Sequence, residues 1–261
     1  MPVFAANLTM MFTEWAFLDR FAAAADAGFP AVEYLFPYDF AAEAIQDRLT
    51  HNGLKQALFN MPPGNWAAGE RGLAALTGRE AEFTAGLETA IAYACVIGAP
   101  RLHMMSGIAS ALDSAAIATY RENFKRAADL TGAAGIGLVI EPINGRDMPG
   151  YFLNDFDRAA AFVTELAAPH VQLQFDIYHR QILHGDVIRA LRDLAPLIGH
   201  IQIASVPDRH EPMTGELDDR RIFAEIDAIG YQGYVGCEYR PLGRTKDGLG
   251  WMANLPPPPA I

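Results

Sequence analysis

The sequence is poor in cysteine and contains no long hydrophobic run. Cys95 and Cys237 are the only cysteines among 261 residues, and neither lies at a metal-binding spacing. This excludes a disulfide framework, and we expect two reduced structural thiols. The absence of about 18 consecutive apolar residues excludes a membrane-spanning helix. The first residues lack a basic region ahead of an apolar stretch, so we expect a cytoplasmic protein that binds no membrane.

Positive charge is also scarce. The chain has 20 Lys and Arg against 31 Asp and Glu, a net charge of -11. Nucleic acid is not an expected partner, because phosphate binding draws its affinity from Lys and Arg. The chain also lacks a dinucleotide-binding glycine turn, a phosphate loop with its lysine, a HExxH zinc motif and a GxSxG elbow. A small-molecule ligand of another class is therefore expected.

Short apolar or β-branched segments alternate with segments of helical spacing. The candidate strands are residues 3–7, 31–36, 55–60, 101–105, 136–141, 171–176, 200–204 and 234–239. The candidate helices are residues 14–27, 79–97, 114–134, 155–166 and 219–229. This alternation predicts parallel strands with crossover helices, and eight such units predict an α/β fold closed into a (β/α)8 TIM barrel. No linker divides the chain, so we expect a single domain over 1–261 with a proline-rich tail at 254–261.

Polar side chains stand at the ends of four neighbouring candidate strands. They are Glu141, Asp176, Gln202 and Glu238. Active sites of such barrels lie at the carboxyl ends of the strands, so these side chains are expected to converge. One strand-end carboxylate is often only a helix cap, but three buried together need a cation or raised pKa values. An all-oxygen set favours Mg²⁺ or Mn²⁺ over Zn²⁺.

A second group of residues is expected to bind the substrate around this site. It consists of His179, Arg209, Arg240, Arg71, Trp66 and His103. The arginines are candidates for holding a carboxylate through two parallel hydrogen bonds, although loop arginines are often only braces. Trp66 and Arg71 lie in the long loop 61–76, which is expected to close over a small ligand. His200 shares the parity of Gln202 and is read as a supporting residue.

Several motifs together resemble the hydroxypyruvate isomerase and 2-oxo-tetronate isomerase family of xylose-isomerase-like TIM barrels. They are NMPPGNWAAGERG at 60–72, EPINGRDMPG at 141–150, QFDIYH at 174–179, QIASVPDRHEP at 202–212, GYQGYVGCEYRP at 230–241 and GLGW at 248–251. The resemblance implies that Glu141, Asp176, Gln202 and Glu238 ligate a divalent metal, and that Glu141 and Glu238 act as acid and base. Gln202 stands where related ketose 3-epimerases have a histidine, which favours the isomerase branch. Asn65 departs from the aspartate that the resemblance implies in this loop, so the fine substrate preference, though not the chemistry, is left open.

The expected function is an aldose-ketose isomerase acting on a small 2-oxo sugar acid. It would convert hydroxypyruvate to tartronate semialdehyde, or 2-oxo-tetronate to its 2-hydroxy-3-oxo isomer, by metal-assisted proton transfer through an enediolate. The alternatives are a metal-dependent ketose 3-epimerase, a non-catalytic sugar-acid-binding barrel and an abasic-site endonuclease. The sequence leaves open the chain length of the substrate, the metal and whether the protein is a homo-oligomer.

Overall fold

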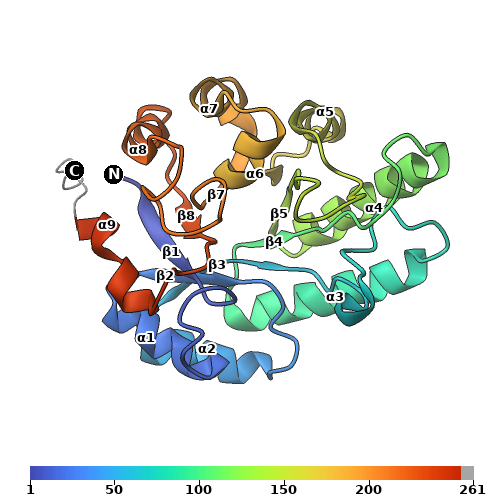
Figure 1. Ribbon diagram of the computed structural model, residues 1–261. Helices are drawn as coiled ribbons and strands as arrows, with labels where there is room; N and C mark the ends of the chain where they lie inside the picture. The colour runs from blue at the N-terminus through green and yellow to red at the C-terminus, as the bar shows by residue number, and fades with distance from the viewer. Residues whose placement is uncertain (254–261) are drawn as a thin grey trace.

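The computed structural model describes residues 1–253, and its central feature is a closed barrel of parallel strands (Figure 1). The strands are β1 (Val3–Asn7), β2 (Ala31–Tyr34), β3 (Lys55–Asn60), β4 (Arg101–His103), β5 (Gly137–Ile140), β6 (Val171–Asp176), β7 (Ile198–Ile203) and β8 (Tyr234–Cys237). They follow one another around the barrel in chain order, and β8 closes it on β1 with Val3 opposite Tyr234. The predicted TIM-barrel fold is confirmed.

Helices surround the barrel on its outside (Figure 1). In the described part of the chain the α-helices are α1 (Arg20–Asp26), α2 (Ala42–His51), α3 (Glu80–Ile97), α4 (Ser114–Ala133), α5 (Phe156–Leu166), α6 (Ile177–Leu183), α7 (Val187–Leu194), α8 (Asp219–Ala228) and α9 (Gly250–Ala253). Short 3₁₀ helices are η1 (Phe17–Asp19), η2 (Trp66–Ala68), η3 (Ala195–Leu197) and η4 (Thr245–Gly248). None of these helices combines the length and apolarity needed to cross a membrane.

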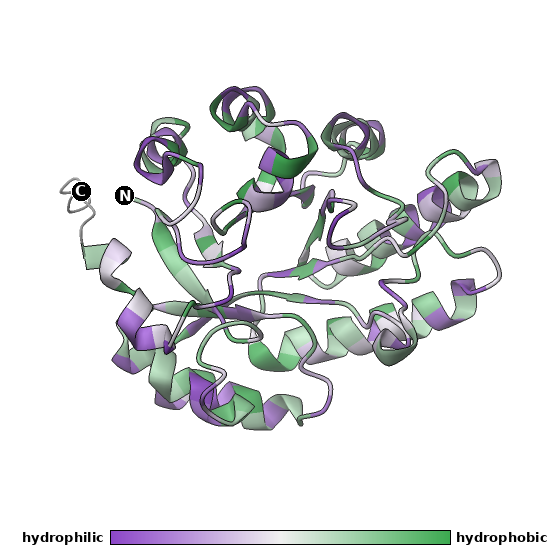
Figure 2. Ribbon diagram, viewed as in Figure 1, coloured by the Kyte–Doolittle hydropathy of each residue, from purple (hydrophilic) through white to green (hydrophobic). Residues whose placement is uncertain are grey.

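The outer helices form because their apolar residues recur at helical spacing. In α3, Phe83, Leu87 and Ala94 share the buried side, and Gly98 ends the helix with a φ of 68°. Glycine suits this left-handed conformation because it has no Cβ. Figure 2 shows bands of hydrophilic and hydrophobic residues along the helices, as expected for helices with one side on the barrel and the other in water.

Four of the five predicted helices match α3, α4, α5 and α8 to within one residue at each end. The fifth, predicted over 14–27, instead forms η1 and then α1, which begins only at Arg20. Helices α2, α6, α7 and α9 are absent from the prediction. Helices α6, α7 and α9 have only 7, 8 and 4 residues, too few for an apolar period to be distinguished from a loop. The predicted tail at 254–261 lies outside the described residues.

Strands β2, β4, β5, β7 and β8 end one or two residues earlier than predicted at the mouth of the barrel, whereas β1, β3 and β6 end as predicted. Strands β5 and β8 end at Ile140 and Cys237, so Glu141 and Glu238 are the first residues beyond them. Strands β2 and β4 likewise stop at Tyr34 and His103, whereas β7 begins two residues before the predicted start at 200. Both glutamates therefore stand at the rim, where the backbone leaves the sheet but is still held by it.

The side chains that point into the barrel are small and apolar at one end and polar towards the other. Ala5, Ala31 and Ala57 form an apolar cluster separate from the large core between barrel and helices. Side chains alternate across a strand, so Asn7 and Glu33 point to the same side as Ala5 and Ala31. Both are buried. The inward positions thus become polar as the strands approach the mouth.

Candidate active site

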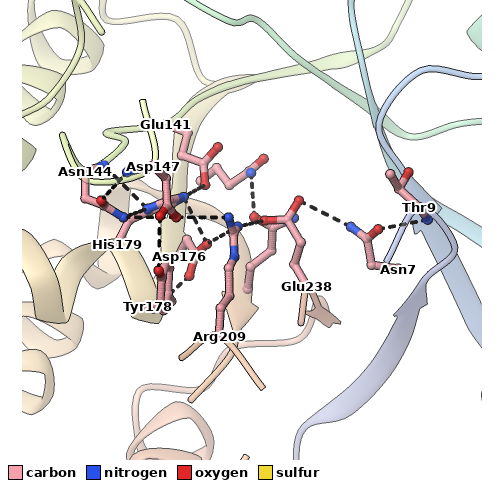
Figure 3. A network of polar contacts seen from close by, with 12 residues as sticks. Asn7, Thr9, Glu141, Asn144, Asp147, Asp176, Tyr178, His179, Arg209 and Glu238 are labelled. Carbon is pink, nitrogen blue, oxygen red and sulfur yellow. Dashed lines mark hydrogen bonds and ion pairs between the residues drawn. The ribbon is translucent and has the colours of Figure 1, made fainter. Parts of the chain in front are cut away.

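Three of the predicted carboxylates meet at the mouth of the barrel (Figure 3). Glu141 follows β5, Asp176 ends β6 and Glu238 follows β8. One oxygen of each, together with a ring nitrogen of His179, lies within 4.8 Å of the others. All four side chains are buried. Residues distant in sequence meet here because parallel strands bring their carboxyl ends to one rim.

Asp176 shows how the local sequence prepares the site. Its Oδ1 accepts a hydrogen bond from the backbone N–H of Tyr178 at 2.7 Å and caps the start of α6. The cap fixes the carboxylate, and Oδ2 remains for the cluster. His179 lies in the first turn of α6, so the same cap also places its ring beside the carboxylates.

Burial raises the pKa of all three carboxyl groups. For Glu141 the pKa lies well above its ordinary value, because repulsion from Glu238 and Asp176 adds to burial. Burial raises the pKa of Glu238 to about 8 and that of Asp176 to about 6, against the opposing effect of Arg209. Glu141 Oε1 and Asp176 Oδ2 accept no hydrogen bond from the described residues. This oxygen set fits a hard divalent cation such as Mg²⁺ or Mn²⁺.

Arg209 supplies a buried positive charge to the cluster. Its Nη2 donates to Glu238 Oε2 at 2.5 Å and lies 3.6 Å from Asp176 Oδ2, while Nη1 donates to Asp147 Oδ2 at 3.3 Å. Its guanidinium carbon lies 4.8 Å from the centre of the Tyr178 ring. Burial opposes the charge, but Glu238 and Asp176 outweigh it and raise the pKa of Arg209. The side chain is thus already engaged by protein carboxylates.

His179 presents a hydrogen-bond donor to the cluster. Asn144 Oδ1 accepts from the backbone N–H groups of Arg146 and Asp147, at 2.9 and 3.0 Å, so its amide group is the one facing His179 Nδ1 at 2.7 Å. Nδ1 must accept that hydrogen bond, and the ring hydrogen is therefore on Nε2. Nε2 lies 3.5 Å from Asp176 Oδ2. Burial and Arg209 keep the pKa of His179 well below its ordinary value.

His103 is the second neutral ring at the site. Its Nε2 lies 3.7 Å from Glu141 Oε2, and neither ring nitrogen has a hydrogen-bond partner among the described residues. Burial lowers the pKa of His103 to about 3, with a contribution from His200. The ring therefore stays uncharged at neutral pH and has free polar atoms for a ligand.

Gln202 lies beside the cluster but is held by other side chains. It stands opposite Asp176 in the pairing of β6 with β7. Its Oε1 accepts from Gln174 Nε2 at 2.7 Å, and its Nε2 donates to Glu33 Oε1 at 2.7 Å. An amide oxygen has two lone pairs, so the bond from Gln174 leaves one for a cation. His200 Nε2, 2.6 Å from Glu33 Oε2, supports this arrangement from below.

A cavity of about 320 Å³ opens above the cluster and collects the remaining candidates. Among its lining residues are Glu141, Glu238, His179, His103, Arg209, Arg71, Arg240 and Trp66. Arg71 lies over the Trp66 ring, with its guanidinium carbon 3.8 Å from the ring centre, and its Nη1 donates to the Trp66 carbonyl at 3.0 Å. Within residues 1–253, Arg71 and Arg240 form no ion pair. Asp176 and Gln202 lie behind the cavity wall rather than on it.

Sequence reasoning missed five residues of this network: Asn7, Glu33, Asn144, Asp147 and Gln174. Asn7 ends β1, so the strand-end rule would have found it. Asn144 and Asp147 follow Glu141 in one loop, and their proximity to it was a usable signal. Glu33 and Gln174 lie inside strands, where only their inward parity distinguishes them.

Comparisons with known proteins agree with this geometry. A family model described as a xylose isomerase-like TIM barrel matches residues 21–255. A 2-oxo-tetronate isomerase of Cupriavidus necator is 56% identical, with 97% of this chain and 98% of that protein covered. The hydroxypyruvate isomerase of Escherichia coli is 42% identical, with coverage of 95% and 97%. A crystal structure from Brucella melitensis, described as an AP endonuclease of family 2, has a TM-score of 0.95 at 50% identity and coverage of 97% and 98%. The chain is therefore an isomerase-type enzyme that belongs to the xylose isomerase-like TIM barrel family, with relatives named 2-oxo-tetronate isomerase and hydroxypyruvate isomerase.

Proposed function

We propose that the protein interconverts a short 2-oxo sugar acid and its 2-hydroxy-3-oxo isomer. Hydroxypyruvate would give tartronate semialdehyde, and 2-oxo-tetronate would give the next longer product. The observation that carries this proposal is that one carboxylate oxygen of Glu141 and one of Glu238 lie within 4.8 Å of each other, and that both residues line the cavity. Two carboxylates with raised pKa values are suited to remove a proton from one carbon and deliver it to the next. The cavity of about 320 Å³ has room for an acid of three or four carbons.

The reaction moves one proton from C3 to C2, and it also moves the hydroxyl proton from the oxygen on C3 to the neighbouring oxygen on C2. We assign removal to Glu141, because its Oε1 accepts no hydrogen bond from the described residues, whereas Arg209 holds Glu238. The resulting enediolate is protonated at C2 by Glu141 on the same face or by Glu238 on the other. A positioned carboxylate of this kind typically contributes about 10² to 10⁴ in rate.

Two further groups stabilise negative charge at the site, one on the substrate and one on the protein. His179 would donate its Nε2 hydrogen to the oxygen on C2 as that oxygen gains negative charge, and it remains neutral while doing so. Arg209 keeps the charge of Asp176 and Glu238 balanced when substrate enters. A divalent ion would be held by Glu141, Asp176, Glu238 and Gln202. When bound, it would supply Lewis-acid stabilisation of the negative oxygens.

The carboxylate of the substrate needs a cation that is not already paired. Arg209 is engaged by three protein carboxylates, whereas Arg71 and Arg240 line the cavity without an ion pair in the described residues. Of these two, Arg71 is pre-oriented by Trp66. A flat guanidinium held by an aromatic ring can bind a carboxylate through two parallel hydrogen bonds. We therefore assign the substrate carboxylate to Arg71.

The test is an NMR screen of substrates in D₂O, with and without a chelator. Hydroxypyruvate or 2-oxo-tetronate should isomerise with solvent deuterium entering at C2, and the chelator should stop the reaction. Fructose and tagatose test the ketose 3-epimerase alternative, and duplex DNA with an abasic site tests the activity in the description of the Brucella structure. Turnover of either of those, without turnover of the 2-oxo acids, would overturn the proposal. Binding of a 2-oxo acid with no proton exchange would identify a non-catalytic barrel.

A further inference from the structure

A fourth buried carboxylate, Glu33 on β2, lies inside the barrel below the candidate active site. It is fully buried, and both of its oxygens accept hydrogen bonds. Oε1 accepts from Gln202 Nε2 at 2.7 Å and from Asn7 Nδ2 at 3.0 Å, and Oε2 accepts from His200 Nε2 at 2.6 Å. None of these contacts belongs to the proposed proton transfer, so the network needs its own explanation.

The position of the Glu33 side chain requires a glycine at residue 236 on β8. Gly236 on β8 lies opposite Gln202 in the pairing of β7 with β8. A Cβ on Gly236 would overlap the Glu33 carboxylate, which lies directly against its Cα. The absence of a side chain at 236 thus lets Glu33 reach across from β2 to β7.

The chemistry of a carboxylate decides how Gln202 is turned. Both oxygens of Glu33 accept hydrogen bonds from side-chain donors, and Gln202 accordingly directs its NH₂ group to Glu33 and its Oε1 away from it. Oε1 then accepts from Gln174 and lies on the side of Asp176, its partner across the β6–β7 pairing. With the amide reversed, the NH₂ group would point towards the cluster, and an NH₂ group cannot ligate a cation. Glu33 therefore selects the one orientation in which Gln202 can be a ligand.

The same oxygen of Glu33 also holds Asn7, which touches the proposed acid-base pair. Asn7 Nδ2 donates to Glu33 Oε1 and lies 3.4 Å from Glu238 Oε1, while its own Oδ1 accepts from the backbone of Thr9 at 3.1 Å. Figure 3 shows Asn7 between Thr9 and Glu238. The amide side chains of Gln202 and Asn7 therefore connect Glu33 to the mouth of the barrel. Gln202 lies opposite Asp176 there, and Asn7 contacts Glu238.

We propose that Glu33 is a positioning residue that orients the Gln202 amide oxygen towards the cation site and holds Asn7 against Glu238. This inference rests on the proposed function, because it takes Gln202 to be a metal ligand. Partners that orient metal ligands from behind commonly change metal affinity about 10- to 100-fold when altered. Glu33 itself touches neither the cavity nor the reacting atoms.

The test is Mn²⁺ titration of the metal-free full-length protein, followed by electron paramagnetic resonance of the free ion. Glu33→Met keeps the length of the side chain but removes both acceptor oxygens, so nothing holds the NH₂ groups of Gln202 and Asn7 in place. We expect Mn²⁺ affinity to fall about 10- to 100-fold. Glu33→Gln is the conservative variant: its one oxygen can still accept from Gln202 and Asn7 while its NH₂ group faces His200 Nε2 in the other ring tautomer, so it should retain most of the affinity. Glu225→Gln, a buried carboxylate paired with Arg192 on the outside of the barrel, should bind Mn²⁺ like the wild type.

The outcomes separate the inference from the function beneath it. If the wild type binds no Mn²⁺, the metal site of the proposed function fails, and the inference fails with it. If the wild type binds Mn²⁺ and Glu33→Met binds it equally well, or Glu33→Gln loses as much affinity as Glu33→Met, only the inference is overturned. Should Glu33→Met not fold, the wild type labelled at glutamine with ¹³C and ¹⁵N decides. Mg²⁺ should shift the side-chain carbonyl of Gln202, and a binding event that leaves this carbonyl unshifted contradicts the orienting role.

Discussion

The two groups of buried carboxylates in this barrel differ in how completely they are hydrogen-bonded. Inside the barrel, both oxygens of Glu33 accept hydrogen bonds from side chains. At the mouth, one oxygen of Glu141 and one of Asp176 accept none from the described residues. Both groups are buried, so burial alone does not separate a structural acid from a reactive one.

This difference in hydrogen bonding is consistent with two separate roles, one structural and one reactive. A buried polar group without a partner costs free energy, about 1–3 kcal/mol for a neutral group and more for a charge. A fold tolerates that cost where a ligand supplies the missing contacts. The fully bonded Glu33 holds its neighbours still, and the under-bonded oxygens of Glu141 and Asp176 remain available. The following predictions challenge this contrast.

The largest effect is expected from removing the charge of an acid at the mouth. Glu141→Gln and Glu238→Gln should each lower isomerisation by about 10² to 10⁴, because the amide cannot take a proton from carbon. Glu141→Gln should leave thermal stability intact, since it removes repulsion between buried acids. The measurements are kcat on the 2-oxo acid and the midpoint of thermal unfolding. Glu225→Gln is the control for changing a buried acid elsewhere, and wild-type turnover by Glu141→Gln would remove its assigned role.

The next largest effect is expected from removing the buried positive charge of Arg209, and it should appear as a lower free energy of unfolding. In Arg209→Met, Glu238 and Asp176 lose their counter-charge, and removing one partner of a buried pair typically costs about 3–5 kcal/mol. The folded pKa values of Asp176 and Glu238 are already about 6 and about 8, above their ordinary values, and would rise further. Such groups stabilise the folded state at low pH and lose that contribution as pH rises through the folded pKa. The loss should therefore be larger at pH 8 than at pH 5.5.

Urea unfolding in a chelator, with and without added Mn²⁺, measures this effect. Mn²⁺ should recover part of the lost free energy of unfolding, because it replaces the missing positive charge. Arg192→Met is the control, since the Arg192 side chain that pairs with Glu225 is exposed, whereas Arg209 is buried. A loss in Arg209→Met that is independent of pH would show that packing on Tyr178, and not charge, is what Arg209 supplies.

A smaller effect is expected from reversing the polarity of the contact with His179. In Asn144→Asp, a carboxylate oxygen would face Nδ1 and draw the ring hydrogen to that nitrogen, leaving Nε2 a lone pair. We expect kcat to fall about 10- to 100-fold, as for other partners that orient a functional group. ¹⁵N shifts of the His179 ring measure the tautomer directly. An unchanged ring tautomer together with reduced kcat would place the function of Asn144 in the loop instead.

The position of the mouth acids was predictable, whereas their hydrogen-bonding partners were not. Parallel strands bring Glu141, Asp176 and Glu238 to one rim whatever the loops do, so strand ends alone located them. Arg209 was placed correctly near the site, but its pairing with Asp147 depends on a loop backbone with a φ of 58°. Residue patterns carry no signal for that conformation in an arginine.

The orientation of amides and rings lies further beyond sequence reasoning. Gln202 is a plausible ligand by position, but which end of its amide faces the site is decided by Glu33, which lies 169 residues away in the chain. The tautomer of His179 is likewise set by Asn144, through backbone N–H groups of the following loop. The orientation of an amide and the tautomer of a histidine ring can be assigned only when their neighbours in space are known.

The smallest effect is expected at the rim, where Arg71 rests on Trp66. Arg71→Lys keeps the charge but loses the flat two-pronged group, and a charge-assisted hydrogen bond is worth about 1.5–3 kcal/mol. KM for the 2-oxo acid should rise roughly tenfold or more while kcat changes little, because the carboxylate is held equally in the ground state and the transition state. Arg240→Lys is the matched comparison, since Arg240 lines the same cavity without an ion pair among the described residues. A larger rise in KM for Arg240→Lys than for Arg71→Lys would assign the substrate carboxylate to Arg240 instead, and would change the direction from which C2 and C3 meet the two glutamates.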